Sequence, residues 1–372
     1  MLTSHAQQTN SCAHGALVVF PAKSDTMNSL MEPQPRGGVR GLLDKLDAVH
    51  VAGDAAVLGI VVATEGSTYQ KPGALVLLGR ETLHHGVISG GCLEAELVQR
   101  AQAVFASGSA ALVDFDTRSD EDLVFGSGTG CRGRVHLLLL PQPRGAPLAQ
   151  ALRQAVLDGL PLTLTLALEG EAIGAGEARI AGHESSVAAR EWRWGTNGAP
   201  GSAAVVAPRA ELRIAPPPRV LLLGAGPETR PLASLARMLG WYVEVMEHRE
   251  RWSGHADCVG VDHRHAKGPD ALVEIMGARH FDAVLVMNHN YDLDARCLHH
   301  LAESSAGYVG LLGPPARRDA LLTEIGDIAA TQLEPRLYAP VGLRLGGEGP
   351  EAIALAIVAQ LQRYLTHDAN QS

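Results

Sequence analysis

The chain has 372 residues, of which 46% are hydrophobic and 19% are charged. This composition is typical of globular proteins, and the length suggests two domains of roughly 150 residues each with additional segments. A formal net charge of −9 and an aromatic content of 4% argue against a nucleic-acid partner. No apolar run approaches the roughly 20 residues of a membrane-spanning helix, so no membrane partner is expected.

Five cysteines occur, at positions 12, 92, 131, 258 and 297. The number is odd and no CxxC pair is present, so a disulfide scaffold is excluded. A reducing, cytoplasmic compartment is the better interpretation. Residues 1–36 are rich in Gln, Ser, Asn and Pro and lack the basic start and long apolar core of a signal peptide. We expect them to form a disordered, dispensable tail.

Residues 37–142 are predicted to form an N-terminal mixed α/β domain. Apolar periodicity predicts helices at 39–52 and 93–105, and strands at 57–64, 74–78, 84–88, 110–115 and 134–140. The residue pattern then changes, and we interpret 143–215 as a small β-rich appendage with its linker. There we expect a helix at 149–157, a strand at 162–168, and strand-like pieces at 203–207 and 211–214.

Residues 216–372 are predicted to form a Rossmann-like parallel-sheet domain. Its opening unit is an apolar strand at 220–223, the turn Gly224-Ala225-Gly226, a helix and a second strand at 241–246. Glu247 follows Gly226 by 21 residues (247 − 226), where an acid bonds a ribose hydroxyl in dinucleotide folds. The helix start is expected to offer free N–H donors to a phosphate. The third glycine of the fingerprint falls at Thr229, so the glycines alternatively serve only the tight turn.

The same α/β alternation continues to the end of the chain. Helices are predicted at 269–276, 292–302, 316–325 and 350–365, and strands at 283–287 and 308–312. Such alternation predicts ligand sites at the C-terminal edge of a parallel sheet. His289 follows the strand at 283–287 and is therefore a candidate ligand contact, with a polar loop residue as the alternative.

Two cysteines lie in glycine-framed loops of the N-terminal domain. Ser89, Gly90, Gly91 and Cys92 precede a predicted helix, whose N-terminus would stabilise a thiolate. The alternative is that Cys92 is a small buried residue that packs the helix start. Gly130, Cys131 and Arg132 lie in a loop with four glycines, which either approach a ligand closely or only make a tight loop. Two soft thiolates suit a metal, sulfur transfer or a sulfur-rich cofactor, whereas zinc is disfavoured because no paired Cys or His spacing occurs.

Several of these motifs together resemble one protein family. GSTYQKPGALVLL, GVISGGCLEAELVQRA and DEDLVFGSGTGCRGRVHLLLLP resemble the N-terminal region of the XdhC/CoxI family. VLLLGAGPETRPLASLARMLGWYVEVMEHRERW, FDAVLVMNHNYDLDARCLHHL, YVGLLGPPARRDALL and VGLRLGGEGPEAIALAIVAQLQ are similar to its C-terminal Rossmann domain. The resemblance covers about 40–365, except for the weakly matching 143–215.

The resemblance implies an accessory factor of xanthine dehydrogenase or a related molybdenum hydroxylase. Such a factor would bind the molybdenum cofactor (molybdopterin), support its sulfuration by a cysteine desulfurase, and deliver it to the apo-enzyme. It would be a cofactor chaperone and a homodimer rather than an enzyme with catalytic residues of its own. The family's two loop cysteines fall on Cys92 and Cys131, as possible contacts of the molybdenum cofactor, and its glycine turn falls on Gly224 and Gly226.

Two other hypotheses stay open at this point. An NAD(P)-dependent oxidoreductase would use the same turn together with Glu247, and NAD(P) would then be the cofactor. A purely structural assembly protein would carry the fold without a ligand. Cofactor content after purification discriminates between these hypotheses.

Overall fold

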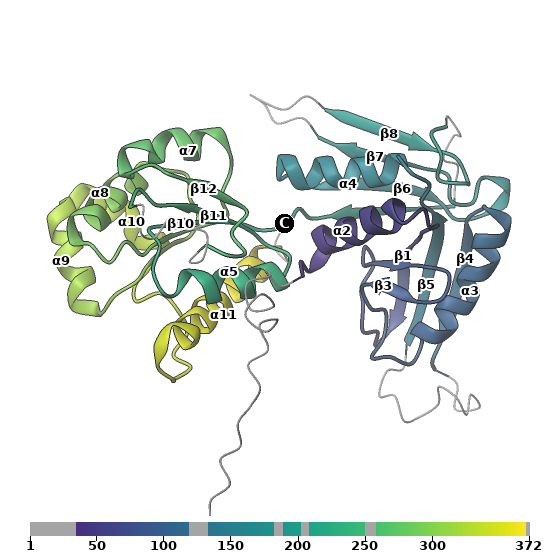
Figure 1. The fold of residues 1–372 in the computed structure, drawn as a ribbon, viewed down its shortest axis with the longest axis horizontal. Helices are drawn as coiled ribbons and strands as arrows, with labels where there is room; N and C mark the ends of the chain where they lie inside the picture. Colours follow the sequence, from purple (N-terminus) through teal and green to yellow (C-terminus); the bar gives the residue numbers. More distant parts are fainter. Residues whose placement is uncertain (1–34, 119–132, 182–188, 202–207, 250–257, 370–372) are drawn as a thin grey trace, which may run out of the picture. The chain divides into compact units, whose positions relative to one another are not determined.

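The computed structural model describes residues 35–118, 133–181, 189–201, 208–249 and 258–369, and Figure 1 draws the remainder as a grey trace. The expected tail at 1–36 lies outside the described residues except for its last two positions. The strands of the described residues form three sheets, which contain five, six and four strands.

The first sheet is antiparallel throughout, with strand order β3-β2-β1-β5-β4. Its strands and the two helices beside it are α2 (Gly38–Val51), β1 (Val57–Gly66), β2 (Leu75–Leu78), β3 (Leu83–His85), α3 (Glu94–Ser107), β4 (Ala111–Asp116) and β5 (Gly133–Pro141). Both predicted helices and all five predicted strands are present. The strand expected at 84–88 is shorter, because the chain leaves the sheet at Gly86, whose φ is +83°.

Helices cover both faces of this sheet, which explains why β1 begins as an unbroken apolar run. Val57 and Val61 of β1 pack in one core with the buried face of α3. Leu58 and Ile60 point to the opposite face and pack in a second core with α2. Neither face of the strand's first six residues is exposed to solvent.

The second sheet is also antiparallel and has the order β8-β7-β6-β9. Its elements are α4 (Pro147–Asp158), β6 (Leu162–Ala167), η1 (Gly170–Ala172), β7 (Gly176–Ile180), β8 (Arg190–Trp194) and β9 (Arg209–Ile214). Leu162, Leu164 and Leu166 of β6 and the fully buried Trp194 belong to the same core as α2 and β1. The expected strand piece at 203–207 lies outside the described residues.

The third sheet is parallel and has the order β12-β11-β10-β13-β14-β15. Its strands are β10 (Arg219–Leu223), β11 (Tyr242–Met246), β12 (His263–His265), β13 (Ala283–Val286), β14 (Val309–Leu311) and β15 (Leu337–Tyr338). In chain order the sheet reads 3-2-1-4-5-6, the order of dinucleotide-binding folds, with its topological switch between β10 and β13. The prediction of a mixed α/β N-terminal part followed by a Rossmann-like parallel sheet is confirmed.

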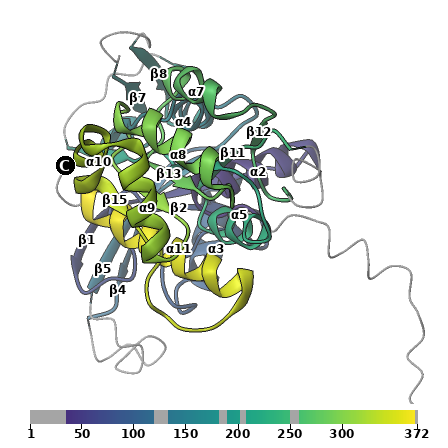
Figure 2. The same cartoon turned by 90° about the vertical axis from the view of Figure 1, so that its left-hand side faces the viewer.

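Helices cover both faces of the parallel sheet as well (Figures 1 and 2). The helices are α5 (Thr229–Met238), η2 (Pro269–Ala271), α7 (Leu272–Ala278), α8 (Tyr291–Ala302), α9 (Pro315–Ile325), α10 (Asp327–Leu333), η3 (Glu334–Arg336) and α11 (Gly349–Ala369). Val220 and Leu222 of β10 pack with α5 and α11, whereas Leu221 and Leu223 pack with α7 to α10. The sequence did not predict the short elements α10, β12 and β15.

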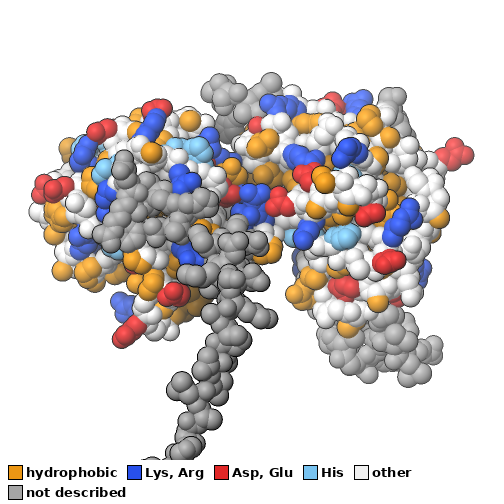
Figure 3. All heavy atoms as spheres, viewed as in Figure 1, with side chains coloured by type: hydrophobic (Ala, Val, Ile, Leu, Met, Phe, Trp, Pro, Cys, Tyr) orange, Lys and Arg blue, Asp and Glu red, His pale blue; other side chains and the backbone are white. Residues whose placement is uncertain are grey.

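Acidic and basic side chains are interspersed on the face of the molecule that Figure 3 shows. Within the described ranges, no helix has the length and apolar character needed to cross a membrane.

Candidate functional site

The loop between β3 and α3 presents the Cys92 thiol at the surface. Cys92 is exposed and unpaired, whereas Cys258 and Cys297 are buried. The alternative interpretation of Cys92 as a buried packing residue is therefore wrong. The helix begins one residue later than expected, at Glu94 with Leu93 as its N-cap, because Leu93 turns into the core under α3.

Ser89 and Glu94 hold this loop in shape through side-chain hydrogen bonds. Ser89 Oγ accepts hydrogen bonds from the N–H groups of Gly91 at 3.2 Å and Leu93 at 3.0 Å, and donates to Glu94 Oε2 at 2.5 Å. Glu94 Oε1 accepts from the N–H groups of Ile88 at 3.0 Å and Ser89 at 2.8 Å. A hydroxyl has one donor and two acceptor sites, so the loop itself occupies all of those on Ser89.

Open space lies at the Cβ positions of Gly90 and Gly91, the two residues that precede Cys92. A Cβ built on either residue meets no heavy atom within 4 Å. Gly91 has a φ of +112°, which only glycine adopts readily. The loop is therefore rigid at Ser89 and unobstructed at Gly90 and Gly91, an arrangement that can admit a bulky ligand to the thiol.

We expect Glu94→Ala to destabilise the protein by about 1–2 kcal/mol at pH 7, because backbone N–H groups lose a charged acceptor. Burial raises the pKa of Glu94, but the hydrogen bonds from Ser89 and Ile88 outweigh it and leave the pKa below its usual value. A carboxyl group whose pKa is lower in the folded state contributes stability at pH values above its pKa in the unfolded state. This contribution is lost as the pH falls through the pKa of the folded state. The difference in free energy of unfolding between Glu94→Ala and wild type should therefore shrink below about pH 4.5.

Urea unfolding of the Glu94→Ala variant at pH 7 and at pH 3.5 measures this effect. Glu96→Ala is the matched control, because Glu96 lies on the first turn of the same helix and forms an i,i+4 ion pair with the exposed Arg100. Such a surface pair contributes about 0.3–0.5 kcal/mol. Equal losses of unfolding free energy in the two variants would contradict the role of Glu94 in holding the loop. A loss in Glu94→Ala that does not depend on pH would contradict it as well.

The second cysteine loop cannot be compared in the same way. Gly130, Cys131 and Arg132 lie outside the described residues, so their predicted role stays a prediction. Of the remaining thiols, burial raises the pKa of Cys297 to about 12, although a hydrogen bond from Asn288 opposes this. Cys297 is therefore a protonated core residue at neutral pH.

Gly224 makes the turn at the switch point of the parallel sheet. It follows β10 directly and has a φ of +93°. A Cβ at this position would lie 2.4 Å from Asn288 Cα, so the chain after β13 packs directly against the turn. Gly224 and His289 are thus brought to one edge of the sheet, as the sequence predicted.

The N–H groups of this turn are already hydrogen-bonded within the protein. Gly224 N–H donates to Met246 O at 2.9 Å, Ala225 N–H to Glu247 Oε2 at 2.9 Å, and Gly226 N–H to Thr229 Oγ1 at 3.0 Å. Proline at position 227 has no N–H to offer. Glu247 and Thr229 thus satisfy the N–H groups of Ala225 and Gly226, so these two groups are not free for a phosphate. The prediction of free donors at the start of the following helix stays a prediction.

Glu247 is correspondingly engaged rather than open to a ribose. It is 3% exposed, and Arg249 donates to it from its backbone N at 2.7 Å, from Nε at 2.9 Å and from Nη2 at 2.7 Å. Burial raises the pKa of Glu247, but the hydrogen bonds from Arg249 and Ala225 hold it below its usual value. Both carboxylate oxygens accept hydrogen bonds from the protein itself.

A cavity of about 500 Å³ opens at the C-terminal ends of β13 and β14. Among the residues that line it are Glu228, His289 and Arg317. His289 Nε2 lies 3.2 Å from Glu228 Oε2, and His289 is the non-glycine residue with positive φ (+53°) in the described part of the chain. Backbone strain of this kind is concentrated at functional sites, which favours His289 as a ligand contact.

A buried carboxylate, Asp294, holds the cavity residue Arg317 in place. Asp294 is 1% exposed and accepts hydrogen bonds from Asn288 Nδ2 at 3.0 Å and from Arg317 Nη2 at 2.6 Å. Sequence reasoning identified His289 but missed Glu228, Asp294 and Arg317. The signal that could have found them is the position of Glu228 and Arg317 just after the turns that follow β10 and β14 at one edge of a parallel sheet.

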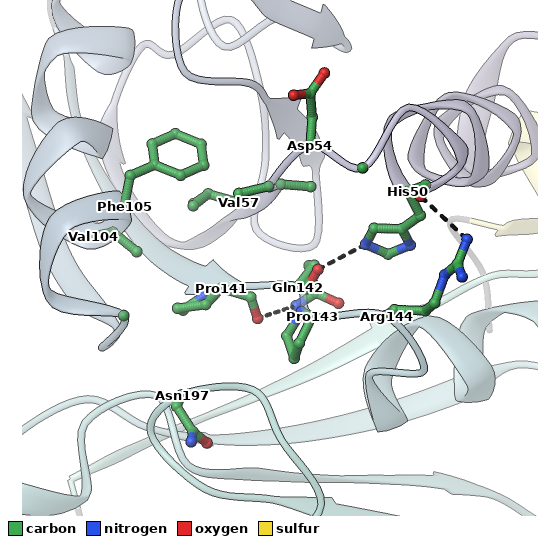
Figure 4. A pocket seen from close by; sticks show the side chains of 14 residues that line it. His50, Asp54, Val57, Val104, Phe105, Pro141, Gln142, Pro143, Arg144 and Asn197 are labelled. Atoms are coloured by element: carbon green, nitrogen blue, oxygen red, sulfur yellow. Dashed lines mark hydrogen bonds between the residues drawn. The ribbon is translucent and has the colours of Figure 1, made fainter.

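A second cavity, of about 520 Å³, lies where α2, α3 and β5 end, and it contains no residue that the sequence singled out (Figure 4). His50 Nε2 lies 2.9 Å from Gln142 O, and Arg144 Nη2 donates to His50 O at 3.2 Å. Gln142 is 2% exposed, and its Oε1 has no hydrogen-bond partner among the described residues. The remaining walls include Val57, Val104 and Phe105, so the cavity is largely apolar.

The fold and these sites define a class of protein: a Rossmann-type α/β protein joined to an antiparallel lobe that exposes Cys92. Within the described ranges, no group of three or more His, Cys, Asp or Glu could hold a metal ion. The family model described as "XdhC and CoxI family" matches residues 50–116, and "XdhC Rossmann domain" matches residues 220–361.

Two further proteins are similar to this chain in sequence. The chain is 30% identical over 331 residues to a protein of Bacillus subtilis (strain 168) that is named as a probable xanthine dehydrogenase subunit, covering 85% of this chain and 95% of that protein. It is 30% identical over 146 residues to "Uncharacterized protein YqeB" of Escherichia coli (strain K12), covering 39% of this chain and 27% of that one.

A solved structure is similar over nearly the same extent. The crystal structure of a xanthine dehydrogenase from Bacillus halodurans matches with a TM-score of 0.69 and 28% identity, covering 87% of this chain and 96% of that chain. The chain belongs to the XdhC and CoxI family.

Proposed function

We propose that this protein is an accessory factor for the maturation of xanthine dehydrogenase or a related molybdenum hydroxylase. It binds the molybdenum cofactor, supports its sulfuration and delivers it to the apo-enzyme. Family membership supports the link to xanthine dehydrogenase, which the Bacillus subtilis relative and the Bacillus halodurans structure carry in their names. The observation that carries the proposal is the exposed Cys92 thiol on a braced loop with open space beside it.

The residues of the Cys92 loop fit such a cargo. A thiolate is a soft ligand suited to molybdenum and to sulfur exchange, and an exposed thiol is accessible to a partner protein. Ser89 and Glu94 fix the backbone, so the thiol is presented without a large ordering cost. Gly90 and Gly91 leave room for a cofactor that carries a fused ring system and a phosphate.

The partners follow from the same proposal. A cysteine desulfurase would supply sulfur, the apo-enzyme would receive the cofactor, and the factor would act as a cytoplasmic homodimer. Within the described residues, Cys92, Cys258 and Cys297 form no disulfide, which suits a reducing compartment. Light scattering tests the dimer, since the monomer has a mass of 39.2 kDa. A mass near that value at micromolar concentration would remove the dimer from the proposal.

The NAD(P)-dependent oxidoreductase is less well supported. The pyrophosphate of a dinucleotide needs free N–H donors at the glycine turn. Those of Ala225 and Gly226 are paired with Glu247 and Thr229, and the carboxylate of Glu228 lies beside Gly226. A negative charge at this place opposes an anionic ligand.

Purification from a molybdenum-replete host tests the two functions against each other. We expect the protein to carry molybdenum and pterin, measured by metal analysis and by fluorescence of the oxidised pterin. We expect NADH to show no binding at micromolar concentrations in a fluorescence titration. Micromolar NADH affinity together with the absence of molybdenum and pterin would favour the oxidoreductase. Absence of all three ligands would favour a structural assembly protein.

A further inference from the structure

The cavity at the C-terminal ends of β13 and β14 combines a buried acid with a guanidinium group. Glu228 is 8% exposed, and Arg317 lines the same cavity with its Nη2 anchored on Asp294. A carboxylate is seldom this buried unless donors compensate its charge. In the structure the ring of His289 provides one contact to Glu228 Oε2, at 3.2 Å.

The remaining walls of the cavity are apolar. They include Leu312, Pro314, Pro340, Val341 and Ile353. A volume of about 500 Å³ is in the range of sites for small organic ligands, which are mostly apolar with few placed polar groups. These walls suit the faces of a planar heterocycle, while Glu228 and Arg317 can each form hydrogen bonds to one part of its edge.

The polarity of the two charged groups restricts the ligand. A carboxylate offers two acceptors side by side, so it matches an edge with two adjacent N–H donors. A guanidinium offers only donors, so it matches an oxo group or an anion. The 2-amino-4-oxopyrimidine ring that pterins and guanine share carries both features. Adenine does not, because its edge presents an acceptor next to a donor.

We propose that this cavity binds the 2-amino-4-oxopyrimidine end of a fused heterocycle, with Glu228 accepting its paired N–H donors and Arg317 donating to its oxo group. This inference rests on the proposed function, in which the cargo contains a pterin. It places recognition of the ring in the Rossmann-like part of the chain, separate from the thiol at Cys92. Guanine of a dinucleotide form of the cofactor shares this chemistry, so the experiment compares both sources.

Calorimetric titration of the full chain with two matched ligand pairs tests the assignment. Pterin and lumazine differ in that lumazine carries an oxo group in place of the 2-amino group, and guanosine and inosine differ by the same amino group. We expect pterin to bind at least tenfold more tightly than lumazine, equivalent to ~1.4 kcal/mol. If guanosine also binds more tightly than inosine by this factor, the site is assigned to the guanine base. If only pterin and lumazine are discriminated, the site is assigned to the pterin.

Glu228→Gln should remove this discrimination, because an amide offers one acceptor and one donor in place of two acceptors. Glu324→Gln, an exposed change on α9 of the same sheet domain, should keep the wild-type ratio. If Glu228→Gln does not fold, the wild-type ratios alone still decide the matter.

Equal affinities within both pairs, or no binding of any of the four probes, would overturn the inference. Unchanged discrimination in Glu228→Gln would overturn it as well. Either result, obtained with a protein that still purifies with molybdenum and pterin, would leave the proposed function standing. Absence of molybdenum and pterin from the purified protein would instead refute the proposed function, whichever heterocycle the cavity prefers.

Discussion

Replacing Cys92 by serine is expected to weaken binding of the molybdenum cofactor at least tenfold, or ~1.4 kcal/mol, while the protein stays folded. The thiol is exposed and its loop is held by Ser89 and Glu94, so serine removes a soft ligand without disturbing a core. Exposed substitutions of this kind change stability by about 0.5 kcal/mol or less. Cofactor affinity and the urea midpoint, measured on the same preparation, give the two readouts.

Cys297→Ser is the matched control for this substitution. Cys297 is fully buried in the core between α8 and the sheet, so a hydroxyl there loses hydration. We expect a loss of stability of about 1–3 kcal/mol, reduced if Asn288 bonds the hydroxyl. Cofactor affinity per folded molecule should stay normal. Wild-type affinity in Cys92→Ser would exclude Cys92 as a ligand of the cofactor, and wild-type affinity in a Cys131→Ser variant as well would exclude the thiol-ligand model.

The parallel sheet could be predicted because its strands are covered on both faces. Residues 220–223 and 283–286 are apolar at every position, and every residue of both runs is buried. Helices between these runs carry apolar residues at helical spacing, and α5 buries Leu232 and Ala236 on one such face. A run of this type needs no knowledge of tertiary contacts to be recognised.

The chemistry of the glycine turn could not be predicted in the same way. The pattern Gly224-Ala225-Gly226 shows where the chain turns, but it does not show which group accepts each N–H. Glu247 lies at the position of a ribose-binding acid, yet it receives hydrogen bonds from Ala225 and Arg249 instead. These choices depend on side-chain conformations and on burial, which a sequence pattern does not contain.

The charged residues of the cavity were missed for a related reason. Glu228 meets His289 across 61 residues of chain, and Arg317 meets Asp294 across 23. Each residue alone is an ordinary polar residue near a helix start. Only the strand order, which places β10, β13 and β14 side by side, brings them to one cavity.

Gly224→Ala is expected to cause the largest loss of stability. The added Cβ would lie 2.4 Å from Asn288 Cα, and 2.8 Å from both Asn288 N and Asn288 Oδ1. Gly224 and Asn288 lie just after the paired ends of β10 and β13. Their backbone atoms therefore cannot move apart without disturbing the hydrogen bonds between these two strands. Overpacking costs about 1–3 kcal/mol, and a side chain at φ +93° adds about 1–3 kcal/mol of backbone strain.

Gly277→Ala, in the same domain, is expected to change stability in the opposite direction. Gly277 lies in α7, and a Cβ there meets no heavy atom within 4 Å. Alanine should stabilise this position by about 0.4–1 kcal/mol, because the unfolded chain loses conformational freedom. Urea midpoints of the two variants at equal m-value measure both effects. A Gly224→Ala protein as stable as wild type would show that the chain after β13 does not pack against the turn, and the cavity beside His289 would lose its geometric basis.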